Sequence, residues 1–435
     1  NLDTVLTYDD SRGESMDIGQ MIVGSEGTLG IVTEATIKLA PLAAKTGIIA
    51  LHFESIEDAC RAAPIAVTHD PAAVELVDRT IIERCRESFS YKSLVEFVIG
   101  TPGGLLLVEV DGETEPEVIE KLDALAKDFR SRGLTQDMVV TTNLGEQARM
   151  WRMREAGLGL LMSVRGDAKP VAFVEDGAVE PELLGDYVAR FEEIVRRYGL
   201  PTAYYGHAGA GCLHIRPMIN LKELNGPENA EILAQEIADL ILEFGGSLSG
   251  EHGDGIVRGA FTERMFGPAL VDSFRDLKLA FDPDSLMNPG KIIDTPAFND
   301  NLRLSPQTGS LTPPTFLNWD EWGGIARAAE QCNGQGACLK DVGTMCPSFM
   351  VTKDEEHSTR GRANLLRQVL NQSLPPEELT GDRIHEAMDL CVECKACKNE
   401  CPSAVDMALL KSEVLALRHA EHGVPLRDRI FAGIA

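Results

Sequence analysis

Apolar and polar positions along the chain recur with the periods of both strands and helices. Alternating or continuous apolar runs predict four strands: 31–39, 47–53, 105–110 and 171–174. From Pro181 to Gly199, apolar residues recur every three or four positions, which predicts a helix with one apolar face. Proline favours a helix start and glycine a helix end, so we expect the helix to fill this interval. Strands and helices mixed between residues 43 and 293 predict an α+β fold.

The chain is long enough for more than one domain. At 435 residues, and with about 150 residues per domain, two or three units are expected. From residue 294 to 315 the composition turns to Pro, Asn, Ser, Thr and Gly, which is typical of an exposed linker. We therefore expect four segments: the end of a domain that begins upstream (1–42), an α+β domain (43–293), a linker (294–322) and a mainly helical domain (323–435).

Composition and charge exclude several classes of function. Apolar residues make up 44% of the chain and charged residues 25%, as in soluble globular proteins. The 68 acidic and 41 basic residues give a net charge of −27, which disfavours binding to nucleic acid or to anionic lipid. We find no signal peptide and no apolar run near the ~20 residues of a membrane span. We expect a cytoplasmic protein without a transmembrane segment, and peripheral attachment to the inner membrane stays open.

Seven of the ten cysteines fall between Cys332 and Cys401, at the short spacings of a metal site in a reduced compartment. Cys391, Cys394, Cys397 and Cys401, followed by proline, form the pattern C-x2-C-x2-C-x3-C-P. In this pattern three thiolates bind one 4Fe–4S cluster and the fourth binds another. A structural zinc site is the alternative, but zinc usually takes two separated pairs of ligands.

A remote cysteine must complete the first three thiolates, and Cys346, also followed by proline, is the candidate. The upstream motif is incomplete, because Gln335 stands where a thiolate would lie between Cys332 and Cys338. A second cluster would have Cys332, Cys338 and Cys401 as its thiolates. Three outcomes stay open: a three-iron cluster, a cluster with a non-cysteine ligand, or no second cluster.

Two glycine-rich segments carry histidines and a carboxylate. The segment from Tyr205 to Arg216 is predicted to form a strand, a turn and a strand, which brings His207 near His214. A second segment places Glu251 and His252 among glycines, which lets a metal or ligand approach the backbone. Two imidazoles and a carboxylate make an open site for a divalent metal, and His252 would then be free to act as a base.

The order of the motifs carries a family resemblance. They are GSEGTLGIVTE (24–34), WRMRE (151–155), FVEDGAV (173–179), the two histidine segments, and Asp282-Pro followed by Asn288-Pro-Gly-Lys. In this order the chain resembles vanillyl-alcohol-oxidase-type flavoproteins of the glycolate oxidase and D-2-hydroxyglutarate/D-lactate dehydrogenase group, particularly long bacterial members with a fused iron–sulfur region. The resemblance implies the C-terminal part of a VAO/PCMH-type FAD domain, an α+β (ferredoxin-like) substrate domain and a mainly helical iron–sulfur domain.

The resemblance also implies roles for individual residues. FAD would contact the chain at Gly24, Ser25, Glu26, Gly27, Gly30, Ile31 and Asn288. The divalent metal, Zn, Mn or Fe, would be bound by His207, His214 and Glu251, and His252 would accept the substrate hydroxyl proton. Arg154 would bind the substrate carboxylate, and Arg216 would be an added clamp.

One loop departs from the family pattern. The metal loop of the family commonly reads G-H-x-G-D-G-N-L-H, whereas Ala210 and Cys212 stand here in place of Asp and Asn. This departure bears on how neighbouring groups orient the metal ligands.

The expected function is FAD-dependent oxidation of a D-2-hydroxy acid of the D-lactate, D-2-hydroxyglutarate or glycolate class to the 2-keto acid. Electrons would pass from FAD to a 4Fe–4S cluster and on to an external acceptor, a quinone or an electron carrier. Two alternatives stay open. One is an iron–sulfur electron-transfer component with a vestigial flavin site, and the other is a flavin-containing binding protein with a structural zinc.

Overall fold

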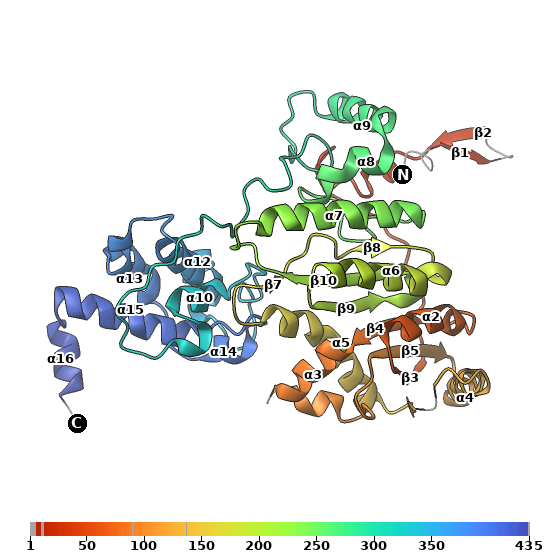
Figure 1. Cartoon of the computed structure of the whole chain (residues 1–435), viewed down its shortest axis with the longest axis horizontal. Coiled ribbons are helices and arrows are strands. Elements are labelled where there is room, and N and C mark those ends of the chain that lie inside the picture. The colour runs from red at the N-terminus through yellow and green to blue at the C-terminus, as the bar shows by residue number, and fades with distance from the viewer. Residues whose placement is uncertain (1–5, 10–12, 89–90, 136, 434–435) are drawn as a thin grey trace.

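The computed structural model describes residues 6–9, 13–88, 91–135 and 137–433. Figure 1 shows a mixed unit of helices and sheet with a helical part beside the β7 edge of the sheet. Short elements precede the sheet: β1 (Leu6–Asp9), β2 (Gly13–Met16) and α1 (Gly19–Ile22).

Within the described residues the mixed unit is built on an eight-stranded sheet in the order β6-β3-β5-β4-β9-β10-β7, with β8 also paired to β10. Its strands are β3 (Lys45–Phe53), β4 (Ala73–Asp78), β5 (Gly104–Gly112), β6 (Met138–Thr141), β7 (Lys169–Pro170), β8 (Gly177–Ala178), β9 (Thr202–His207) and β10 (Cys212–Ile219). Among the described residues the strands of this sheet pair antiparallel.

The sheet consists of two ferredoxin-like halves joined edge to edge. In the first half, β3-α2-β4 and β5-α4-β6 follow each other and the strands lie in the order β6-β3-β5-β4. The second half repeats this with β8, β9 and β10, and a single bridge between Ala178 and Ser247 stands in the place of a fourth strand. The halves meet where β4 pairs with β9, matching Leu76 to Gly206.

Helices cover both faces of this sheet. They are α2 (Ile56–Val67), α3 (Arg79–Glu87), α4 (Glu115–Ser131), α5 (Leu144–Met162), α6 (Leu184–Arg197) and α7 (Gly226–Glu243), followed by α8 (Thr262–Phe266) and α9 (Pro268–Phe281). Buried residues of α2, α4, α6 and α7 share one core, and those of α3 and α5 share the other. Strand alternation sorts the side chains: Ile49 and Leu51 face the first core, Ile48 and Ala50 the second.

The helical part has its own core. Its helices are α10 (Ile325–Glu330), α11 (Pro347–Thr352), α12 (Thr359–Leu370), α13 (Asp382–Asp389), α14 (Ala396–Glu400), α15 (Met407–His422) and α16 (Leu426–Ala432). Several of its cysteines are packed into this core with Leu366, Met388 and Leu410.

Ion pairs and hydrogen bonds tie the helical part to the mixed unit. Both carboxylate oxygens of Asp167 accept hydrogen bonds from Arg327, at 2.8 and 2.7 Å. Lys222 lies between Asp167 and the buried side chain of Glu330, with its Nζ 3.3 and 2.6 Å from their oxygens. These partly buried pairs fix the helical part against the β7 edge.

Two of the four predicted strands are confirmed and two are wrong. Predicted strands 47–53 and 105–110 fall within β3 and β5. Residues 31–39 are not a strand: Ile31 and Leu39 are about 80% exposed, and no neighbouring strand among the described residues receives their backbone hydrogen bonds. Residues 171–174 are not a strand either, because the Val171 N–H bonds back to the Lys169 carbonyl and turns the backbone.

The predicted helix is confirmed as a 3-10 turn at Pro181–Leu183 that continues into α6, with Gly199 in the left-handed conformation after its end. The four predicted segment boundaries stay predictions. No helix in the described part of the chain is long and apolar enough to cross a membrane.

The junction of the two halves offers a test of the fold. Buried Asp78 caps α3 by accepting from the Ile81 N–H at 3.0 Å, and accepts from the Tyr204 N–H of the other half at 2.9 Å. Asp78→Ala should lower the free energy of unfolding by about 2–4 kcal/mol, because a cap is lost and buried N–H groups lose their acceptor. Urea denaturation measures this loss.

Asp186→Ala is the matched control, since Asp186 forms only an exposed pair with Arg61 and should change stability by less than about 0.5 kcal/mol. Equal effects of the two substitutions would contradict the role of Asp78.

Candidate active site and cofactor sites

Several of the predicted site residues lie on one face of the sheet. In β4, β9 and β10 the residues that face the α2–α7 core are apolar, for example Val74, Leu76 and Leu213. The alternate positions, which point to the opposite face, are Glu75, Tyr205, His207, His214 and Arg216. The two-residue period of the strands therefore sets polar and charged side chains side by side.

The turn between β9 and β10 fixes the register of the two histidines. Tyr205 pairs with His214 and Cys212 with His207, so the two imidazoles are diagonal neighbours, with ring centroids 5.3 Å apart. Gly211 closes the turn with φ of 67°, and a Cβ there would lie 1.8 Å from the Val179 carbonyl oxygen. Only glycine fits this position.

Three imidazoles converge on one carboxylate oxygen. Oε1 of Glu251 lies 3.2 Å from Nε2 of His207, 3.2 Å from Nε2 of His214 and 3.5 Å from Nε2 of His252. Ligand atoms about 2.1 Å from a tetrahedral metal stand about 3.4 Å apart. The distances from Glu251 to His207 and to His214 therefore match those between two ligands of one metal.

An overlapping set of groups also has metal-ligand spacing. Ligand atoms of Asp176, His214, Glu251 and His252 lie within 4.8 Å of one another. Asp176, however, is fully buried, and its Oδ2 accepts hydrogen bonds from the Ser249 hydroxyl and from the N–H groups of Glu251 and His252. We assign Asp176 to holding this loop rather than to binding metal.

A second acidic residue orients His207. Glu75 lies on β4 and its Oε1 is 2.6 Å from Nδ1 of His207, which leaves Nε2 directed at Glu251. A carboxylate on the far nitrogen fixes the ring and the tautomer of a ligating histidine. The other oxygen of Glu75 accepts a hydrogen bond from Nε of Arg154 at 2.7 Å, and the Arg154 guanidinium stacks on Tyr205.

Glu175 orients His252. Its Oε1 is 2.9 Å from Nδ1 of His252 and 3.3 Å from Arg258, and its Oε2 is 3.3 Å from Arg216. Arg216 also donates to the Tyr205 hydroxyl at 3.0 Å and is buried. The substrate contact predicted for Arg216 stays a prediction.

Burial changes the acid–base behaviour of His214. Burial, the largest effect, lowers the pKa of His214 to about 4, although the nearby Glu175 acts in the opposite direction. Nδ1 of His214 is a buried nitrogen without a hydrogen-bond partner among the described groups. The ring is thus neutral at physiological pH, the form in which a histidine binds metal.

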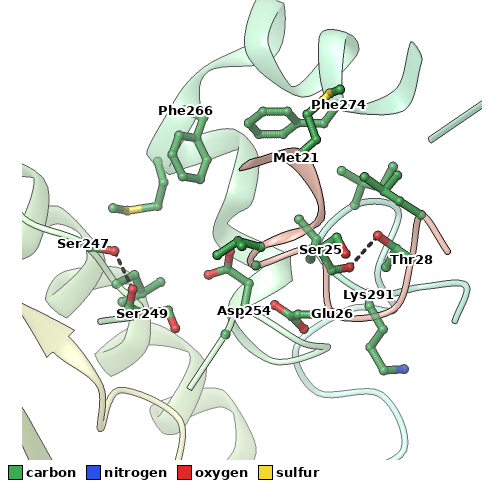
Figure 2. A pocket seen from close by; sticks show the side chains of 18 of the residues that line it. Met21, Ser25, Glu26, Thr28, Ser247, Ser249, Asp254, Phe266, Phe274 and Lys291 are labelled. Carbon is green, nitrogen blue, oxygen red and sulfur yellow. Dashed lines mark hydrogen bonds between the residues drawn. The ribbon is translucent and has the colours of Figure 1, made fainter. Parts of the chain in front are cut away.

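The predicted flavin turn lies against this loop. Gly24, Ser25 and Glu26 line a cavity of about 520 Å³ that is also bounded by Glu251, and Figure 2 shows Phe266 and Phe274 on its wall. The two oxygens of Glu26 accept from the N–H groups of Asp254 and Gly255 at 2.7 and 2.9 Å. A mixed polar and apolar cavity of this size is suited to part of a flavin nucleotide.

The other predicted flavin contacts lie around the same turn. Asn288 is exposed, and its amide donates to the Glu26 carbonyl at 2.6 Å. Gly27 has φ of 71°, and the chain leaves the cavity through Gly30 to the exposed Ile31. Their contact with FAD stays a prediction.

The cysteines predicted to hold the 4Fe–4S cluster come together. Cys346, Cys391, Cys394 and Cys397 all line one small cavity between α11, α12 and α14. The Cys346 sulfur accepts from the Thr359 N–H at 3.1 Å. Four thiols around one cavity, from two separate segments, fit a four-iron cluster.

Sequence reasoning gave no role to Glu75, Glu175 or Asp176. The last two stand inside the quoted motif FVEDGAV, where two adjacent acidic residues in an apolar run signal paired, buried carboxylates. Glu75 had only a weak signal, a single carboxylate within the predominantly apolar strand β4.

Comparison with known protein families shows to which family the chain belongs. Residues 43–292 match the family of FAD linked oxidases, C-terminal domain, which is more than half of the chain. The chain belongs to the FAD-linked oxidase family. Residues 331–406 match a 4Fe-4S dicluster domain.

Relatives of this FAD-linked oxidase chain include hydroxy-acid dehydrogenases. A D-2-hydroxyglutarate dehydrogenase of Pantoea ananatis is 30% identical over 97% of this chain and 45% of its own length. A D-lactate dehydrogenase of Archaeoglobus fulgidus is 30% identical over 63% of this chain and 57% of its own length. The chain thus spans about half the length of the curated relatives it matches.

Solved structures similar to the chain include p-cresol methylhydroxylase with substrate bound. This structure is 15% identical and covers 60% of the chain, with a TM-score of 0.43.

Acid should destabilise the metal-free protein through His214. Above about pH 6.5 the ring is neutral in both states; between about 6.5 and 4 only the unfolded state takes up the proton, so the free energy of unfolding falls as pH falls. The loss should be roughly 3 kcal/mol by pH 4. Urea denaturation of chelator-treated protein across this range measures it.

His214→Gln should weaken the pH dependence of the free energy of unfolding. His357 lies in the helical part, so His357→Gln should leave that dependence unchanged. The same pH dependence in wild type and His214→Gln would contradict the assigned burial effect.

Proposed function

We propose that the chain forms the substrate, metal and electron-exit parts of an FAD-dependent dehydrogenase that oxidises a D-2-hydroxy acid to the 2-keto acid. The observation that carries the proposal is the convergence of His207, His214 and His252 on Glu251, beside a cavity bordered by the predicted flavin turn. The names of relatives support the class D-2-hydroxyglutarate, D-lactate or glycolate.

The charges around the site favour an anionic substrate. Four carboxylates, Glu75, Glu175, Asp176 and Glu251, face three guanidiniums, Arg154, Arg216 and Arg258. A divalent cation bound here would add two positive charges beside these guanidiniums. Both would attract the carboxylate of a substrate.

Arg154 is suited to bind the substrate carboxylate. Its Nε is held by Glu75 and its plane by the Tyr205 ring, 5.1 Å from the guanidinium carbon. No hydrogen bond from its two Nη groups occurs to any residue described. A fixed guanidinium with free donors binds a carboxylate in one orientation.

His252 is suited to remove the hydroxyl proton. Its Nδ1 is held by Glu175, so that Nε2 faces the proposed metal position, and its side chain is 39% exposed. Glu175 stabilises the imidazolium that forms when the proton arrives. A divalent cation bound here would lower the pKa of the substrate hydroxyl, and bound FAD would accept the two electrons.

The proposed electron exit is the four-cysteine cavity of the helical part, from which electrons leave to a quinone or an electron carrier. A vestigial flavin site with a relay role is the competing function. The close approach of His207, His214, Glu251, Arg154 and His252, which are suited to bind a metal and a carboxylate and to accept a proton, supports the dehydrogenase.

The proposal predicts selective loss of substrate oxidation. The FAD-loaded protein, mixed anaerobically with a panel of D- and L-2-hydroxy acids, should bleach with D-2-hydroxy acids. His252→Ala and Glu251→Ala should slow bleaching by about 10²–10⁴-fold or more while iron content stays intact, because each removes the base or a metal ligand. Stopped-flow absorbance and metal analysis measure both effects.

Glu180→Gln, which changes an exposed glutamate outside the site, is the control and should bleach at the wild-type rate. Flavin that stays oxidised with every acid would favour the relay. Normal bleaching in His252→Ala would remove its role as base.

A further inference from the structure

The two cysteine groups of the helical part differ in their number of ligands. A dicluster domain implies two four-iron clusters, and each needs four ligands. The cavity at Cys391 has four thiols. The other group has Cys332, Cys338 and Cys401, and Gln335 occupies the position of its missing cysteine. The remaining cysteines, Cys60, Cys85 and Cys212, lie in the mixed unit.

The three thiols lie in the core of the helical part. Cys332 and Cys338 are 7% and 6% exposed, and with Cys401 they pack in this core. Cys401 also lines the same cavity as Gln335, which lies between Cys332 and Cys338 in the chain. The segment from Cys332 to Cys338 and Cys401 therefore border one region of the helical part.

The loop that carries Gln335 is fixed around this pocket. Arg360 donates its backbone N–H to the Cys338 sulfur at 3.3 Å and its guanidinium to the Gly334 carbonyl at 3.0 Å. Backbone N–H and arginine donors around the sulfurs stabilise the negative charge of an iron–sulfur cluster. Donors of this kind are expected around an iron–sulfur cluster, although one cysteine ligand is absent here.

The position that lacks a cysteine ligand, at Gln335, borders a cavity. Gln335 and Cys401 both line a cavity of about 1000 Å³ between α3 and α5 of the mixed unit and α14 of the helical part. Gln335 is exposed. A fourth iron next to Gln335 would be bound by water or by the Gln335 amide oxygen, which is a weak ligand. This iron would be lost readily on oxidation.

We propose that Cys332, Cys338 and Cys401 hold a 3Fe–4S cluster, while Cys346, Cys391, Cys394 and Cys397 hold a 4Fe–4S cluster. Three thiolates are the full ligand set of a three-iron cluster, so no further donor is needed. The proposal concerns the helical part alone and stands whichever substrate the protein oxidises.

Protein purified anaerobically and then oxidised tests the proposal by iron and sulfide analysis, EPR and Mössbauer spectroscopy. We expect about seven cluster iron atoms per chain, counted by Mössbauer spectroscopy apart from any mononuclear iron, and an EPR signal in the oxidised state, since an oxidised three-iron cluster is paramagnetic and an oxidised 4Fe–4S cluster is not. Gln335→Cys should raise cluster iron to about eight and abolish the oxidised signal. About four cluster iron atoms without that signal, or about eight in the wild type, would overturn the proposal.

Two further variants keep the outcome clear. Asn333→Cys adds a thiol to the same loop two residues away and should leave the oxidised signal unchanged; loss of the signal would contradict the position given to Gln335. Cys346→Ser should remove the four-iron cluster and keep the three-iron signal. Loss of the three-iron signal instead would assign Cys346 to the other site and overturn the proposal.

Discussion

The convergence of three imidazoles on Oε1 of Glu251 is the contact on which the other features of the site depend. Two constraints produce it. Strand alternation in β9 and β10 puts His207 and His214 on one face, and buried Asp176 holds the backbone of Glu251 and His252 above them. Because Asp176 is fully buried and bonded to two N–H groups of this loop, the loop has one position relative to the sheet.

The same loop links the proposed metal position to the proposed flavin cavity. Glu26 accepts from the N–H groups of Asp254 and Gly255, so the predicted flavin turn is tied two to four residues away from Glu251 and His252. A shift of this loop would move the proposed base, the proposed metal ligand and the cavity wall together. At the β7 edge, the ion pairs Asp167–Arg327 and Lys222–Glu330 hold the cysteine-bearing part against the same domain.

Motifs with fixed spacing predicted which candidate ligands come together, whereas the residues that orient them became apparent only from the fold. The cysteine pattern and the remote Cys346 predicted the four thiols of one cavity, since short spacing dictates which sulfurs meet. Glu75 is far from His207 in sequence, and only the pairing of β4 with β9 brings them together. Residues 31–39 have strand periodicity, but a strand also needs a hydrogen-bonding neighbour, which a local pattern does not supply.

The most direct test of the convergence is anomalous X-ray diffraction from crystals of the metal-loaded protein, with data at the manganese, iron and zinc absorption edges. The iron–sulfur centre serves as an internal positive control. The site described here predicts one further peak, within about 2.5 Å of Nε2 of His207, Nε2 of His214 and an oxygen of Glu251. Clear iron–sulfur peaks with no peak between these three side chains would contradict it.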